Sequence, residues 1–183
     1  MRSARDGANA LREALREQGG TLATVLGERP PARAPRFDDP GPAQLAAAGP
    51  RTHGQEHEYE LLLEMILEGY RLHYGQPVAV QSDDADLKLL LGDQLYALGL
   101  SRLAELGDLD AVTELADVIS LAAQAHSASN PGLAGAVWEA GAVSVGWGAS
   151  DAHRRAKAHA RAHRPDAERA LRAAATACRG EGL

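Results

Sequence analysis

Three glutamates stand at intervals of four residues in the middle of the chain, at Glu60, Glu64 and Glu68. On a helix this spacing places the side chains on one face, one turn apart. Carboxylates in that arrangement can share a divalent cation, and Mg²⁺ held by one or two carboxylates usually also takes phosphate oxygens of a substrate. A solvated acidic stripe, with Glu68 near Arg71 on the same face, explains the same pattern without a ligand. The solvated stripe is the simpler explanation, and the metal site is the alternative.

A second group of carboxylates, Asp83, Asp84 and Asp86, precedes a leucine-rich stretch. We expect Asp83 or Asp84 to cap the helix that follows, because a carboxylate there accepts hydrogen bonds from free amides and meets the positive end of the helix dipole. Asp93 falls farther along, inside an apolar run. A buried carboxylate is unfavourable unless it is hydrogen-bonded, so Asp93 is expected to have a structural partner.

The most basic part of the chain lies between residues 153 and 164. His159 and His163 stand four residues apart and could both bind zinc, but no nearby cysteine or well-placed carboxylate completes a ligand set. A surface that binds anions or a partner and a plain solvated face are both open explanations. The single cysteine, Cys178, has none of the features that mark a reactive nucleophile.

The elements that must position these groups are helices. Alanine and leucine dominate the apolar residues, aromatic residues make up only 4% of the chain, and β-branched residues are few. Alanine and leucine lose little side-chain entropy in a helix. The sequence therefore predicts an all-α fold, a bundle of six or seven helices. The first two expected helices cover residues 9–18 and 58–73, and the third runs from Asp83 or Asp84 to Gly107. The next two are expected to start at Asp108 and at Pro131. The last two are expected to run from Ser150 or Asp151 to Pro165 and over residues 166–178.

Composition divides the chain into three parts. Residues 1–28 are expected to form a short N-terminal helical segment, and residues 56–183 a helical domain. Between them, six prolines fall between residues 30 and 50. Proline lacks a backbone donor and fixes φ, so residues 29–55 are expected to be a linker that is disordered or extended on a surface.

Charge and composition also exclude several classes of protein. The formal net charge of -6 argues against a general nucleic-acid binder. The lone cysteine cannot form an internal disulfide, which suits a reducing compartment. No apolar run approaches the roughly 20 residues of a transmembrane helix, and the first residues do not resemble a signal peptide. We expect a cytoplasmic protein.

The helix expected after Pro131 suggests a partner. Small residues recur along it at intervals of four, at Gly132, Ala136, Ala140, Ser144 and Gly148. Such a face lets another helix approach closely. The same helix carries Trp138 and Trp147, a residue type that is enriched at interface hot spots. The alternative is that both tryptophans pack within the monomer.

One stretch resembles a known family. Gly75-Gln76-Pro77 is followed, after an apolar run, by Gly92-Asp93-Gln94-Leu95. This order is similar to the middle of the trans-polyprenyl diphosphate synthases, in which Arg-Arg-Gly-x-Pro precedes an apolar run into Gly-Asp-x-Leu. Gly75, Pro77, Gly92 and Asp93 are the positions that carry the likeness, which extends over residues 58–150. The resemblance implies a truncated isoprenoid synthase fold.

The departures from the family pattern are equally informative. Two Asp-rich motifs in those enzymes hold Mg²⁺, which stabilises the departing diphosphate. The resemblance places the first motif at Glu64, Met65 and Glu68, where Met65 offers Mg²⁺ no ligand. The arginine pair that grips diphosphate corresponds to His73 and Tyr74, and the second Asp-rich motif has no counterpart.

Retained helices with missing ligands resemble the small, non-catalytic subunit, component I, of heterodimeric heptaprenyl and hexaprenyl diphosphate synthases. The resemblance implies an accessory, regulatory subunit that stabilises a catalytic large subunit in a heterodimer and influences prenyl chain length. Mg²⁺ is then expected only in the catalytic partner, with prenyl diphosphate as a further ligand to consider. Two alternatives stand beside this one: a compact Mg²⁺-dependent prenyltransferase that uses Glu64 and Glu68, and a helical protein-interaction module without isoprenoid function.

Overall fold

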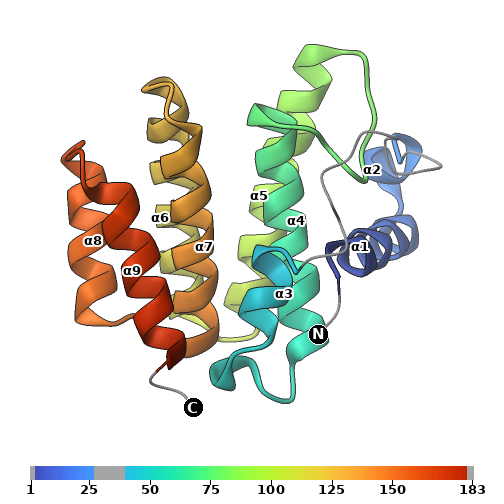
Figure 1. The fold of residues 1–183 in the computed structure, drawn as a ribbon. Helices are drawn as coiled ribbons and strands as arrows, with labels where there is room; N and C mark the ends of the chain where they lie inside the picture. Colours follow the sequence, from blue (N-terminus) through green and yellow to red (C-terminus); the bar gives the residue numbers. More distant parts are fainter. Residues whose placement is uncertain (1–2, 27–39, 181–183) are drawn as a thin grey trace. The chain divides into compact units, whose positions relative to one another are not determined.

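The structure, a computed structural model, describes residues 3–26 and 40–180, and the predicted all-α class is confirmed (Figure 1). These residues form nine α-helices and one short 3-10 helix, and they contain no β-strand. The count exceeds the expected six or seven because α2 and α3 are additional short helices. The elements are α1 (Ala4–Gln18), α2 (Gly20–Thr24), α3 (Pro42–Ala47), η1 (Pro50–Thr52), α4 (Glu56–Tyr74), α5 (Ala85–Glu105), α6 (Leu109–Ser127), α7 (Pro131–Trp147), α8 (Asp151–Arg161) and α9 (Ala167–Gly180).

Local capping sets where several helices begin. The side chain of Asp84 accepts hydrogen bonds from the amides of the first turn of α5, as expected. Asp108 caps α6, Asn130 caps α7 and Ser150 caps α8 in the same way. Each cap satisfies amides that have no partner within the helix, which explains why these four boundaries could be predicted.

The expectation of an irregular linker over residues 29–55 is wrong from residue 40 onward. Residues 42–47 and 50–52 are helical, and Ala43 and Ala46 are fully buried. Pro42 and Pro50 begin these elements, where the missing backbone donor has no helical acceptor to lose. The part of the expected linker from residue 29 to 39 lies outside the described residues.

The chain divides into two compact units rather than one domain over residues 56–183. Unit 1 contains Met1–Gln44 and His57–Leu106, and unit 2 contains Leu45–Glu56 and Gly107–Leu183. The division therefore falls within α3, after the first residue of α4, and just after α5. Every site described below lies within one unit.

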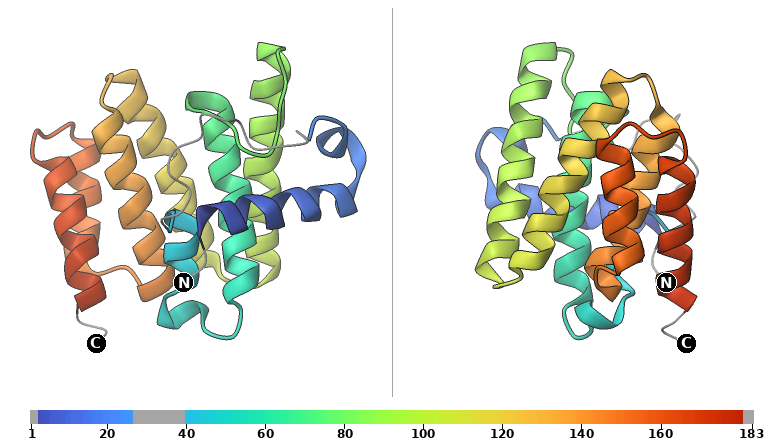
Figure 2. Two further views of the ribbon diagram at one scale, coloured as in Figure 1. Left: turned by 45° about the vertical axis from the view of Figure 1, so that its right-hand side comes forward. Right: turned by 90° about the vertical axis from the view of Figure 1, so that its left-hand side faces the viewer.

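In unit 1, α1 lies across α4, and α4 runs beside α5 (Figure 2). Leu11 and Leu15 of α1 are fully buried. The backbones of α4 and α5 come close at Gly69, where an added Cβ would lie 2.8 Å from the carbonyl oxygen of Gly92. Within the N-terminal helical segment expected over residues 1–28, α1 thus packs on α4 as part of the core of unit 1.

In unit 2, α6 to α9 form a helical bundle (Figure 1). A side chain on Gly141 of α7 would overlap the Val118 side chain of α6. The middle of the small-residue face of α7, Ala136 to Ser144, is buried inside this unit, and Trp138 is only 3% exposed. Trp138 and this part of the face therefore serve packing within the chain, whereas Trp147 is half-buried.

Charge is distributed unevenly within unit 2. α6 and α7 contain four acidic residues and no lysine or arginine, whereas α8 and α9 contain seven lysines and arginines. Opposite charges thus face each other across the bundle. Within the described residues, no helix has both the length and the apolar character that a membrane crossing requires.

Candidate functional site

Glu60, Glu64 and Glu68, which we call the carboxylate row, lie on α4 inside unit 1. Their exposed fractions are 4%, 0% and 0%. The expected solvated stripe is therefore wrong. The sequence pattern could not reveal this, because α1 and Gln44, which are distant in sequence, cover the row: a side chain added at Gly7 of α1 would lie 2.9 Å from Glu64 Oε1.

Glu68 is held by the connection between α4 and α5. Its Oε1 accepts hydrogen bonds from three successive backbone amides, those of Val78 at 2.8 Å, Ala79 at 2.6 Å and Val80 at 3.0 Å. We call residues 78–80 the amide loop. Successive N–H groups that point at one position form a concavity that binds anions, and here the anion is a side chain of the same protein.

Arg71 and Gln44 also contact the row. Arg71 Nη1 lies 3.1 Å from Glu64 Oε2 and 3.3 Å from Glu68 Oε2. Burial lowers the pKa of the Arg71 guanidinium, but the two adjacent carboxylates outweigh burial and the pKa lies above its usual value. Gln44 Nε2 donates to Glu60 Oε1 at 3.2 Å and to Glu64 Oε1 at 3.1 Å.

This arrangement does not fit Mg²⁺ bound by Glu64 and Glu68. The guanidinium of Arg71 already provides the positive charge between the two carboxylates, and it would repel a second cation. The oxygen of Glu68 that faces the amide loop is surrounded by donors, which leave little room for a metal. Among the described residues, no group of three or more His, Cys, Asp and Glu side chains is placed to hold a metal ion.

The other positions of the synthase-like pattern have structural surroundings. Met65 is fully buried in the core of unit 1. The His73 ring stacks on Tyr96, with centroids 5.4 Å apart, and Tyr74 is 42% exposed. The pKa of the Tyr96 hydroxyl is raised, first by burial and then by neighbouring groups that include Tyr74 and Asp93. His73 and Tyr74 therefore belong to an aromatic cluster at the end of α4.

The four positions that carry the resemblance have separate local roles. Gly75 follows the last residue of α4, and Pro77 leads into the amide loop. Gly92 allows α5 to approach α4, since an added Cβ would lie 2.7 Å from the His73 ring. The expectation that Asp93 is buried is wrong: its side chain is 72% exposed and lies 3.1 Å from His73 Nε2. Asp93 points away from the core because each step along a helix turns by about 100°.

A second polar cluster, which the sequence did not predict, joins α6 to α8 in unit 2. Lys157 Nζ lies 2.6 Å from Glu114 Oε2 and 2.8 Å from Asp117 Oδ2. His153 Nε2 lies 2.8 Å from Glu114 Oε1, and Arg161 lies 2.6 Å from Asp117. We call these five residues the charge network. Much of the basic stretch between residues 153 and 164 is therefore paired within the chain rather than free to bind anions.

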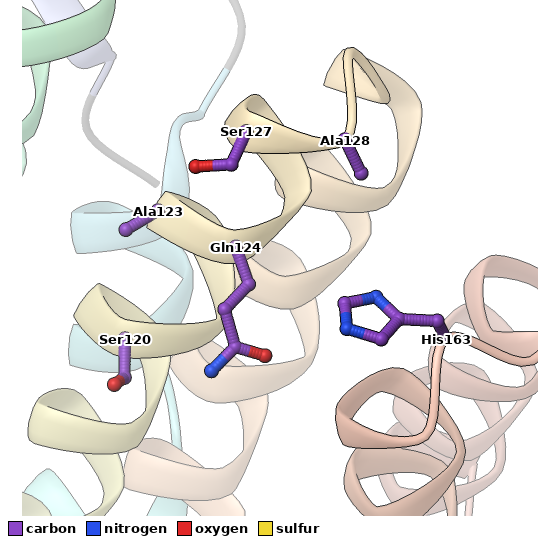
Figure 3. Close-up of a pocket in the computed structure, with 6 residues that line it drawn as sticks. All are labelled: Ser120, Ala123, Gln124, Ser127, Ala128 and His163. Carbon is purple, nitrogen blue, oxygen red and sulfur yellow. The ribbon is translucent and has the colours of Figure 1, made fainter.

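Unit 2 also has a surface hollow of about 600 Å³ between α6 and the end of α8. Figure 3 shows the ring of His163 and the amide of Gln124 on opposite sides of it. His163 has a positive φ of 51°. The described residues that line the hollow include no carboxylate, lysine or arginine. Of the two histidines considered as a zinc pair, His159 lies 3.3 Å from Asp166, and His163 follows the end of α8.

Comparison with known proteins adds no relative: no family model, no curated protein and no solved structure matches the chain.

Proposed function

We propose that this chain is an accessory, non-catalytic subunit of a polyprenyl diphosphate synthase, which binds a catalytic large subunit and influences prenyl chain length. The observation that carries the proposal is the state of Glu64 and Glu68. In the synthase-like pattern they occupy the position of the first Mg²⁺ motif, but here they are buried and bound to Arg71 and the amide loop. A chain that uses these carboxylates for packing would need a partner to supply Mg²⁺ and ionise the substrate.

The surface of α5 supports the binding part of the proposal. Leu89 and Leu90 are 47% and 64% exposed. Large apolar side chains next to each other on a helix are a common feature of surfaces that bind proteins. The partner proposed for this surface is the helical large subunit of a heterodimeric synthase, and the prenyl diphosphate would be bound and ionised there.

The test is to co-express this chain with large subunits of heterodimeric polyprenyl diphosphate synthases. We expect one of them to co-purify with the chain and to make prenyl diphosphate only in the complex. Prenyl transfer by the isolated chain at ordinary rates would contradict the proposal and favour a compact enzyme. Failure of every large subunit to bind would favour a helical interaction module without isoprenoid function.

Two matched variants locate the surface. Leu90 of α5 and Leu109 of α6 are equally exposed, at 64%. Leu90→Glu is expected to weaken co-purification by at least tenfold, because it places a charge in an apolar interface, at a loss of about 1.4 kcal/mol or more. Leu109→Glu is expected to leave binding unchanged. Equal effects of the two substitutions would show that α5 is not the binding surface.

A further inference from the structure

The amide loop has the geometry of a receptor for a small oxyanion. Its three N–H groups point at one oxygen of Glu68, and the amide of Val78 also lies 3.1 Å from the second oxygen. Arg71 contacts that second oxygen at 3.3 Å. A carboxylate in this position thus receives hydrogen bonds on both oxygens, four from the backbone and one from the half-buried guanidinium of Arg71.

The receptor is fixed by contacts that do not involve Glu68. Arg12 of α1 donates a hydrogen bond to the carbonyl oxygen of Val78. This carbonyl belongs to the same peptide group as the Ala79 amide, which donates to Glu68. Val80 forms an antiparallel bridge with Leu26, and the amide of Gln81 donates to Val25 at 2.8 Å. The orientation of the loop therefore has supports in α1 and the segment after α2, so we expect the N–H groups to converge even without the Glu68 carboxylate.

We propose that the amide loop, together with Arg71, is an anion-binding site that the protein keeps closed with its own Glu68 as an internal ligand. The ligand class is a small oxyanion, and a planar carboxylate such as formate or acetate matches the two-oxygen contact. In the native chain Glu68 is tethered beside the loop, so its effective concentration far exceeds that of a dissolved anion. The proposal concerns unit 1 alone and does not depend on the proposed partner.

The test removes the internal ligand and supplies an external one. Glu68→Ala opens the site, and thermal unfolding is followed in sodium formate, sodium acetate and sodium chloride at equal ionic strength. We expect formate and acetate to raise the unfolding temperature of Glu68→Ala in a saturable manner and chloride to raise it much less. The native protein should show no difference among the three salts, because its site is filled.

Glu60→Ala is the matched control. Glu60 is also buried on the same face of α4 and receives a hydrogen bond from Gln44, whereas the three amides of the loop donate to Glu68. Formate and acetate should therefore act on Glu60→Ala no more than chloride does. Equal effects of all three salts on Glu68→Ala, or equal effects of formate on the two variants, would overturn the proposal.

A second measurement applies even where Glu68→Ala folds poorly. Glu68→Gln keeps the shape of the side chain but removes its charge, and one of its terminal atoms becomes a donor. The amides of Val78, Ala79 and Val80 should exchange with solvent faster in Glu68→Gln than in the native protein, while amides in the middle of α4 keep their protection. Unchanged exchange of the three loop amides would show that they do not bind the Glu68 carboxylate as an anion, and it would overturn the proposal.

Discussion

Replacement of Glu114 by glutamine is the sharpest test of how unit 2 is held together. The inward face of α8 consists of His153, Ala156, Lys157 and Ala160. It has no large apolar side chain, although α8 also packs along α9. We therefore expect the charge network to contribute strongly to the attachment of α8 to α6.

The magnitude follows from burial and distance. The side chains of Glu114 and Lys157 are 8% and 10% exposed and lie 2.6 Å apart. Removal of one partner of a buried ion pair usually destabilises a protein by about 3–5 kcal/mol. Lys157 keeps Asp117 as a second partner at 2.8 Å, so we expect the lower end, about 3 kcal/mol. With urea slopes of about 1–3 kcal/mol per molar, the unfolding midpoint would fall by about 1–3 M.

The distribution of aromatic residues provides the assay. Both tryptophans, Trp138 and Trp147, lie in unit 2, and all four tyrosines lie in unit 1. Tryptophan fluorescence during urea unfolding thus reports on unit 2 alone. Asp151→Asn is the control, because Asp151 pairs with Arg154 at an exposed position, and it should leave the midpoint nearly unchanged.

A double variant separates a lost ion pair from a general loss of packing. Glu114→Gln combined with Lys157→Met removes both charges, and replacement of a buried pair by neutral groups is often close to neutral. We expect the double variant to be more stable than Glu114→Gln alone. The reasoning is refuted if Glu114→Gln behaves like Asp151→Asn, or if the double variant is less stable than the single one.

Three further predictions concern other features. Gly141→Ala should destabilise unit 2 by about 1–3 kcal/mol in the same urea assay, because its Cβ would overlap Val118. At Gly135 the nearest atom to an added Cβ would lie 3.9 Å away, so Gly135→Ala should be neutral or stabilising by about 0.5–1 kcal/mol. Burial raises the pKa of Glu114, but its bonds to His153 and Lys157 outweigh burial and the pKa is lowered. The stability that the charge network contributes is therefore fully present above the ordinary glutamate pKa of about 4.3, and it is lost as the pH falls through the lower pKa of Glu114 in the folded protein. The stability of unit 2, measured by tryptophan fluorescence, should therefore drop below about pH 4, and it should drop less in Glu114→Gln. Asp84→Ala should destabilise α5 by about 1 kcal/mol, and Asp84→Asn much less, as measured by tyrosine fluorescence.

Local features of the fold could be predicted from the sequence. The all-α class, the caps at Asp84 and Asp108, and the end of α4 before Gly75 depend on residues within one turn of each other. Short-range rules for capping and helix breaking are sufficient there. The prolines of residues 40–50 do not predict α3 and η1, because proline breaks a helix in its interior, although it is favourable at the first position of a helix.

The candidate site could not be predicted in the same way. The spacing of Glu60, Glu64 and Glu68 placed them correctly on one face of a helix, but it carries no information on what covers that face. Their partners include Gln44, which lies 16 and 20 residues away from Glu60 and Glu64. The charge network could not be predicted for the same reason, because Glu114 and Lys157 are 43 residues apart. Pairing over such distances follows from tertiary packing, which no periodicity within one helix encodes.

The membership of residues 45–56 in unit 2 determines how the protein can be divided. Arg51 donates a hydrogen bond to the carbonyl oxygen of Val145 at 2.7 Å, and an added Cβ on Gly146 would lie 2.5 Å from the carbonyl oxygen of Ala46. A fragment that starts at residue 107 would lack these contacts with the end of α7. A fragment designed to contain all of unit 2 therefore needs residues 45–56 joined to residue 107 through a designed loop, without residues 57–106.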